Sequence, residues 1–130
     1  MLKNGTLQLK ISAIFILLLG IIHTFFAAFA LEPLLVGINK DLKMTMYFMF
    51  IASGLAIIFS GTLSLYIAGL SKTTLNLIAL ILHLNTLFLI LLGILAILFM
   101  FTNPFSYLTL LAAVFHAVSV FNLKKETRNV

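Results

Sequence analysis

Four long apolar runs dominate this sequence and limit what it can fold into. They cover about residues 11–31, 44–70, 74–101 and 105–123. Each run reaches the roughly 20 residues that an α-helix needs to cross a bilayer. Strands are a poor alternative, because the strands of membrane barrels hold about 10 residues and alternate polar with apolar side chains. The sequence therefore predicts an all-α integral membrane protein, a four-helix bundle that runs up-down-up-down.

Composition supports a membrane protein rather than a soluble one. Hydrophobic residues make up 63% of the chain and charged residues 8%, whereas soluble globular domains average about 45–50% and 25%. The 130 residues leave room for one domain, so we expect a single transmembrane domain over residues 1–130. The connections between the runs are too short to fold alone, and we expect no soluble catalytic module.

The basic residues lie between and beyond the apolar runs, and the net charge is +5. With the N-terminus inside, the inner side collects six of the eight cations: Lys3, Lys10, Lys72, Lys124, Lys125 and Arg128. The positive-inside rule therefore predicts that both termini face the cytoplasm. This distribution favours contact with the lipid bilayer and argues against nucleic-acid binding. We expect a multi-pass protein of a cell membrane, namely the bacterial cytoplasmic membrane.

The first run also resembles a secretory signal peptide. Lys3 and Lys10 precede an apolar stretch that contains Ala28-Phe29-Ala30, similar to an A-x-A cleavage site. The stretch before that site is longer than the 7–15 apolar residues of a typical signal peptide. We therefore expect the first run to remain as a span, whereas cleavage would leave three.

Small side chains recur every four residues along the second run and predict a narrow ridge on one helix face. In lipid, helices associate through such faces because another backbone can approach closely. The ridge therefore indicates packing within the monomer or, alternatively, an interface with a homodimer partner or another membrane subunit. Its members, with two glycines that widen it, are Ala52, Ala56, Ser60, Ser64, Ala68, Gly54 and Gly61.

Three histidines, His23, His83 and His116, lie inside the first, third and fourth runs. A polar ring in hydrocarbon normally turns toward the bundle interior or a partner. Small or polar residues lie three or four positions from each histidine, so we expect all three to face inward. By residue count His83 and His116 lie at about the same depth, and His23 about one turn higher.

These histidines allow three interpretations. The simplest is that each imidazole hydrogen-bonds to a neighbouring polar side chain or backbone carbonyl. A second is a ligand-binding or proton-handling site made by His23, His83, His116, Asn76 and Thr86. A third is a metal site in which His83 and His116 ligate a b-type haem axially. Asn85 points roughly opposite to His83 on a helix, so it is the better candidate for hydrogen bonding to another helix.

Enzymatic chemistry finds little support in the sequence. The chain has no Cys, which excludes a disulfide, a thiolate nucleophile and an iron–sulfur cluster. The apolar runs contain Ser and His but no acid that would complete a catalytic triad. Phosphate-binding Gly loops and HExxH motifs do not occur. Glu32, at the end of the first run, is expected to cap the outer interface rather than to catalyse a reaction.

Three short motifs are similar to those of a known group of membrane proteins. They are Gly20-x-x-His23, the segment from Phe48 through Ser53-Gly54 to Gly61, and Asn103-Pro104 before the fourth run. In these motifs the chain resembles small four-span bacterial integral membrane proteins that form a family of unknown function. The resemblance would cover most of the chain and implies four spans, but it implies no activity.

The sequence as a whole predicts a small polytopic membrane protein without catalysis. We expect it to act as an accessory subunit or as a binder of a small hydrophobic ligand in the bundle interior. The alternative is a haem- or quinone-linked redox protein that uses His83 and His116.

Overall fold

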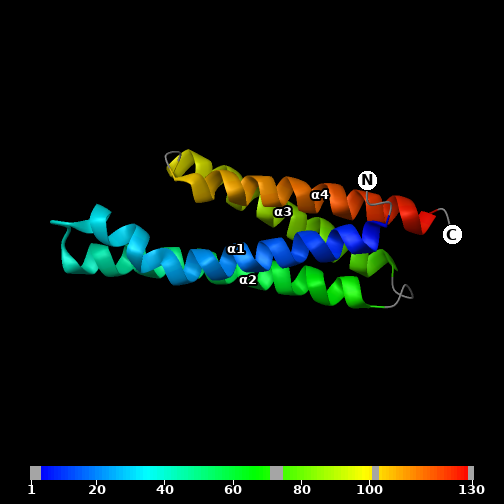
Figure 1. Ribbon diagram of the computed structural model, residues 1–130, viewed down its shortest axis with the longest axis horizontal. Helices are drawn as coiled ribbons and strands as arrows, with labels where there is room; N and C mark the ends of the chain where they lie inside the picture. The colour runs from blue at the N-terminus through cyan, green and yellow to red at the C-terminus, as the bar shows by residue number, and fades with distance from the viewer. Residues whose placement is uncertain (1–3, 71–74, 101–102, 129–130) are drawn as a thin grey trace.

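The computed structural model describes residues 4–70, 75–100 and 103–128, and within these ranges it is helical almost throughout. The elements are α1 (Gly5–Leu31), the short 3-10 helix η1 (Glu32–Leu35), α2 (Lys40–Gly69), α3 (Leu75–Phe99) and α4 (Pro104–Arg128). The four long helices pack antiparallel to their neighbours (Figure 1). Each of them is long and apolar enough to cross a membrane. The predicted four-helix membrane bundle is therefore confirmed.

α1, α2 and α4 begin before the predicted apolar runs because polar residues cap and continue them, whereas α3, at Leu75–Phe99, is shorter than the predicted run 74–101. The Asn39 side chain accepts hydrogen bonds from the backbone N–H groups of Asp41 and Leu42, so α2 begins at Lys40 rather than at the predicted residue 44. The Asn103 side chain accepts from the backbone N–H of Phe105 at the start of α4. The predicted tight turn over residues 71–73 lies outside the described residues.

Close backbone contacts hold three of the helix interfaces, and glycine makes each one possible. In α2, a Cβ atom added at Gly61 would lie 2.6 Å from the backbone nitrogen of Leu17 in α1. At Gly93 in α3 it would lie 2.8 Å from Leu110 Cα in α4, and at Gly5 it would lie 2.6 Å from the backbone nitrogen of Leu123. These distances leave no room for a side chain, so α1–α2, α3–α4 and α1–α4 are tight contacts.

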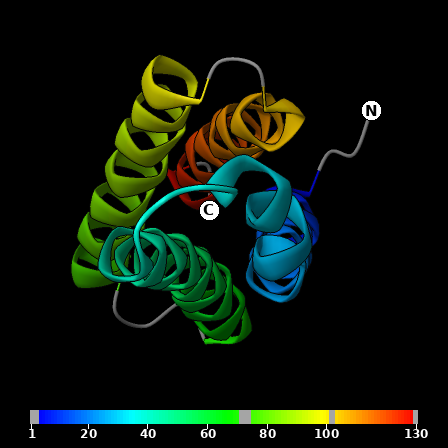
Figure 2. The same cartoon turned by 90° about the vertical axis from the view of Figure 1, so that its left-hand side faces the viewer.

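The α2–α3 interface is more open than these three. Within the described residues, no glycine makes a close contact across it, and α2 and α3 are packed less closely than the other neighbouring helices. The molecule is thus two tight hairpins, α1–α2 and α3–α4, that meet along α1 and α4. Figure 2 shows the four helices from the end at which η1 joins α1 to α2.

The interior contains two apolar clusters with a polar layer between them. The first cluster comprises Ile16, Leu19, Ile57, Leu89, Ala112 and Ala113. The second comprises Leu9, Ile67, Ala68, Leu82 and Val120. On every helix the residues between these two clusters include a buried polar side chain: Ser12, Ser60, Ser64, Asn85 and His116. Large apolar side chains cover the outside, as Phe25 at 75% and Phe121 at 68% exposure illustrate, and this surface suits a lipid environment.

Candidate functional site: a buried polar layer beside an apolar cleft

His116 lies at the centre of the polar layer with no exposed surface. Its Nδ1 atom lies 3.3 Å from Ser12 Oγ in α1, and its Nε2 atom lies 3.4 Å from Ser64 Oγ in α2. Asn85 of α3 continues the layer, because its amide nitrogen donates to Ser64 Oγ at 2.8 Å. One hydrogen-bonded network therefore links all four helices.

The neighbouring acceptors fix the orientation of the Asn85 amide. One end of the amide lies 3.1 Å from the backbone carbonyl oxygen of Ser60. A carbonyl oxygen can only accept, so this end must be the nitrogen. The amide oxygen then accepts from the Ser60 hydroxyl at 2.8 Å. Both N–H groups of Asn85 are thus used inside the protein.

The donor and acceptor of each hydrogen bond in the polar layer can be assigned in the same way. The Ser12 hydroxyl donates to the carbonyl of Leu9 at 2.9 Å, so it accepts from Nδ1–H of His116. Ser64 Oγ accepts from Asn85, and its own proton is then directed to Nε2 of His116. His116 accordingly carries its proton on Nδ1. Within the described residues, no buried side-chain nitrogen or oxygen lacks a partner.

His23 has different surroundings and lies closer to the end of the bundle at which η1 follows α1. Its Nε2 atom lies 3.0 Å from Ser53 Oγ. Its ring stacks on Phe50, with centroids 4.1 Å apart and planes 7° from parallel, and it meets the edge of Phe105. In α1, His23 follows Ser12, the partner of His116, by eleven residues, or about 16 Å along a helix. His23 and His116 therefore do not share a site.

The expectation that all three histidines turn inward is wrong for His83. Its side chain is exposed on the outer face of α3, and its Nδ1–H donates to the carbonyl of Ala79 one turn earlier. This local bond satisfies the ring on the surface, so burial is not required to provide a partner. His83 and His116 consequently do not face each other, and the axial pair that the haem b alternative requires does not form. In the described residues no three of His, Asp and Glu come close enough to hold a metal ion.

The structure describes the side chain of one of the other two residues proposed for the histidine site, Thr86. Thr86 is half-buried, and its hydroxyl donates to the carbonyl of Leu82 in its own helix. Asn76 lies in the first turn of α3, and its side chain is outside the described part of the chain. The structure thus does not bring His23, His83, His116 and Thr86 together in one site.

The small residues of α2 lie mostly inside the monomer. Gly54 and Gly61 lie against α1, Ser60 and Ser64 belong to the polar layer, and Ala68 is buried in the second apolar cluster. At the other end of the ridge Ala56 is half-buried and Ala52 is exposed. Most of the ridge is therefore occupied by this chain's own helices.

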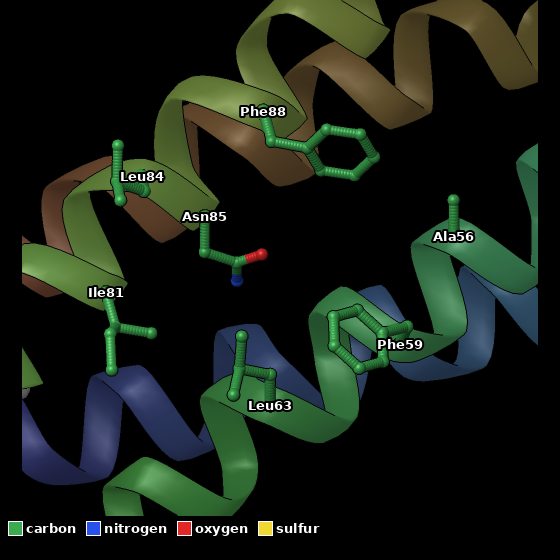
Figure 3. Close-up of a pocket in the computed structure, with 7 residues that line it drawn as sticks. All are labelled: Ala56, Phe59, Leu63, Ile81, Leu84, Asn85 and Phe88. Carbon is green, nitrogen blue, oxygen red and sulfur yellow. The ribbon is translucent and has the colours of Figure 1, made fainter.

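Sequence reasoning missed an apolar cleft between α2 and α3, next to the polar layer. Its volume is about 300 Å³, at the lower end of the range for small-molecule sites. The α2 wall consists of Ala56, Phe59 and Leu63, and the α3 wall of Ile81, Leu84, Asn85 and Phe88 (Figure 3). Both sets follow helical spacing, but the gap itself depends on how the two hairpins meet, and no local pattern encodes that.

Phe59 and Phe88 show that the cleft is open on its outer side. They come from opposite walls, and their side chains are 68% and 42% exposed. Asn85, at 7% exposure, is the polar member of the lining and lies deepest toward the buried layer. The cleft is thus apolar, faces lipid and has one amide at its base.

Glu32, Lys43 and Tyr47 form a polar cluster at the turn between α1 and α2. The Lys43 ammonium lies 2.7 Å from a carboxylate oxygen of Glu32, and the Tyr47 hydroxyl donates to the other oxygen. The hydrogen bonds from Lys43 and Tyr47, with Lys43 the stronger influence, hold the pKa of Glu32 below its usual value of 4.5. These contacts hold the start of η1 against the first turns of α2. Gly37, at φ +82°, allows the chain to turn between the two helices.

These features define a small four-span helical membrane protein with a polar layer in its core and a cleft on one side. Comparison with known proteins gives no match to a family model, to a curated protein or to a solved structure. The resemblance to small four-span membrane proteins thus extends to four apolar helices, and no family is identified.

Proposed function

We propose that this protein binds a small hydrophobic ligand in the cleft between α2 and α3 and does not catalyse a reaction. The observation that carries the proposal is the cleft itself, an apolar space of about 300 Å³ with one buried amide at its base. The sequence suggested a ligand in the bundle interior. The interior is filled by two apolar clusters and the polar layer, so the cleft is the better place.

The proposed orientation of the protein in the membrane rests on the distribution of its basic residues. Lys10 and Lys124 lie near the start of α1 and the end of α4, which are at the same end of the bundle (Figure 1). The positive-inside rule places this end in the cytoplasm. We therefore propose a single transmembrane domain over residues 1–130, with both termini inside, in the cytoplasmic membrane of a bacterium. The cleft would then open sideways into the hydrocarbon.

An accessory role beside another subunit is the alternative. The small residues that suggested a partner interface are largely packed against this chain's own helices, with Ser60 and Ser64 having no exposed surface. A homodimer or other partner would have to use the outer face of the bundle instead. The cleft provides a more specific observation, and ligand binding is the better-supported function.

Photolabelling of the cleft tests the proposal. The protein is reconstituted in lipid nanodiscs with an apolar alkyl diazirine probe, and the labelled residues are identified by mass spectrometry. Ala56→Phe places a large side chain in the cleft, whereas Ala52→Phe adds the same side chain one turn earlier, at an exposed position. We expect saturable labelling of Leu63 and Ile81 in the wild type and in Ala52→Phe, and its loss in Ala56→Phe.

Saturation separates binding from contact with bulk lipid, because labelling of the outer face rises in proportion to the probe. Exposed residues such as Phe25 and Phe121 serve as internal references for this linear behaviour. If labelling at Leu63 and Ile81 rises linearly like these references, or is unchanged by Ala56→Phe, the cleft does not bind a ligand.

A further inference from the structure

We propose that the ligand carries a hydrogen-bond donor, as in a long-chain or prenyl alcohol, and that its hydroxyl donates to the amide oxygen of Asn85. This inference rests on the proposed function and names the chemical class of the ligand. The hydrogen-bonding positions of Asn85 that the protein leaves free determine which polar group of a ligand it can bind.

Both donors of Asn85 are occupied. Its two N–H groups go to the Ser60 carbonyl at 3.1 Å and to Ser64 Oγ at 2.8 Å. An amide nitrogen has no third donor to offer. A ligand whose polar group only accepts, such as an ether, a ketone or an ester, would therefore find no donor on this residue.

The acceptor of Asn85 is only half used. Its Oδ1 atom accepts one hydrogen bond, from Ser60 Oγ at 2.8 Å, whereas an amide oxygen has two lone pairs. Figure 3 shows this oxygen directed toward the side of the cleft that Ala56, Phe59 and Phe88 surround. The side chain is more than nine-tenths buried. The free acceptor thus lies at the base of an apolar space.

The rest of the lining offers a ligand no other hydrogen-bonding side chain. The other six residues are Ala56, Phe59, Leu63, Ile81, Leu84 and Phe88, and none of their side chains can form a conventional hydrogen bond. A ligand hydroxyl in the cleft would leave its proton unsatisfied unless it reached Asn85. Because an unmade hydrogen bond is costly in an apolar site, the cleft favours a ligand whose donor lies at the depth of Asn85.

The test compares two competitors of matched alkyl chain length, an alcohol and an ether, against the same diazirine probe. Wild-type protein in nanodiscs is labelled at Leu63 and Ile81 with the apolar diazirine probe, and 1-dodecanol or dodecyl methyl ether is added. Each competitor is expressed as its measured mole fraction in the bilayer, so that partitioning does not bias the comparison. We expect the alcohol to compete about threefold to tenfold more strongly, the range of one neutral hydrogen bond.

Two variants assign the preference to Asn85. Asn85→Leu should bind both competitors equally. Ser60→Ala removes the hydroxyl that occupies Oδ1 but keeps the Ser60 carbonyl that orients the amide, so the preference for the alcohol should persist or grow. If Asn85→Leu fails to fold, the wild-type comparison and Ser60→Ala still decide the question.

The outcomes separate this inference from the proposed function. Equal competition by the alcohol and the ether in the wild type, with saturable labelling intact, would overturn the hydroxyl preference and leave a purely apolar ligand. A preference that survives in Asn85→Leu would also overturn it. Absence of saturable labelling would instead contradict the cleft as a binding site.

Discussion

The amide nitrogen of Asn85 in α3 donates to Ser64 Oγ in α2 at 2.8 Å, across the interface where the two helical hairpins are least closely packed. Ser64 in turn lies 3.4 Å from His116 of α4, which reaches Ser12 of α1. Directional bonds therefore link the hairpins at a place where glycine contacts do not. The same residue, Asn85, also forms the base of the cleft.

Replacing His116 should weaken the bundle measurably. His116→Leu removes both hydrogen bonds of the ring and leaves the Ser64 hydroxyl without its acceptor. Interhelical hydrogen bonds in membranes are worth about 0.6 kcal/mol on average, and a buried unsatisfied group adds to the loss. We expect the free energy of unfolding, measured by denaturant titration in detergent, to fall by about 1–3 kcal/mol.

Val114→Leu is the matched control for that measurement. Val114 lies on the same helix and is 49% exposed, so the change should alter the free energy of unfolding by less than about 0.5 kcal/mol. Equal effects of the two substitutions would show that the polar layer does not stabilise the bundle.

The directed hydrogen bonds predict the tautomer of His116. Ser12 uses its proton on the Leu9 carbonyl, so Nδ1 of His116 should carry the ring proton and Nε2 should accept from Ser64. The ¹⁵N chemical shifts of selectively labelled protein distinguish a protonated from an unprotonated ring nitrogen. A proton on Nε2 would mean that the chain of bonds runs in the opposite direction.

Gly61→Ala should separate α1 from α2. The added methyl group would lie 2.6 Å from the backbone nitrogen of Leu17 and 3.0 Å from the carbonyl oxygen of Ala13. Backbone atoms of a packed helix cannot move aside cheaply, so we expect a loss of about 1–3 kcal/mol in the free energy of unfolding.

Gly69→Ala is the control with the opposite sign. Among the described residues, no atom beyond the neighbouring backbone of α2 lies within 4 Å of a Cβ at Gly69, and alanine is the better helix former. This variant should be neutral or slightly stabilised, by up to about 1 kcal/mol. If Gly61→Ala behaved like Gly69→Ala, the close approach of α1 and α2 would be incorrect.

The cluster around Glu32 predicts a pH dependence at the α1–α2 turn. The pKa of Glu32 is lowered by Lys43 and Tyr47, so the contact stabilises the turn fully above the usual pKa of 4.5 and loses this effect as the pH falls through the lowered pKa. Tyr47→Phe should shift the pKa of Glu32 upward, toward 4.5. The measurement is the pH titration of the Glu32 carboxyl carbon by NMR.

Tyr107→Phe serves as the control, because Tyr107 is an exposed tyrosine on another helix, α4. It should leave the titration of Glu32 unchanged. An unaltered pKa in Tyr47→Phe would show that the tyrosine hydroxyl does not contribute to the cluster.

The architecture could be predicted from the sequence because it depends on properties that each segment carries alone. Continuous apolar runs of bilayer length specify four spans whatever their neighbours are. The burial of ridge residues such as Gly61 and Ser64 follows from the small size that close helix packing needs. The helix ends were less predictable, since Asn39 and Asn103 extend the helices by capping beyond the apolar stretch.

The site was less predictable because it depends on how the hairpins meet. Ala79 and Thr86 suggested an inward face for His83, but Thr86 bonds within its own helix and Ala79 itself provides the carbonyl that satisfies His83. The face that points inward carries Leu82, Asn85 and Leu89 instead. The cleft has no local signature, because its two walls come from helices whose separation is set by α1 and α4.

The most direct test of the proposed function is to identify what the protein retains when it is purified. Wild type, Ala52→Phe and Ala56→Phe are purified in the same detergent, and small hydrophobic molecules are extracted and quantified by mass spectrometry against the protein. We predict that the wild type and Ala52→Phe retain one hydroxylated apolar molecule at close to one per chain, and that Ala56→Phe retains little of it. Equal amounts in all three proteins, or none in any of them, would contradict ligand binding in the α2–α3 cleft.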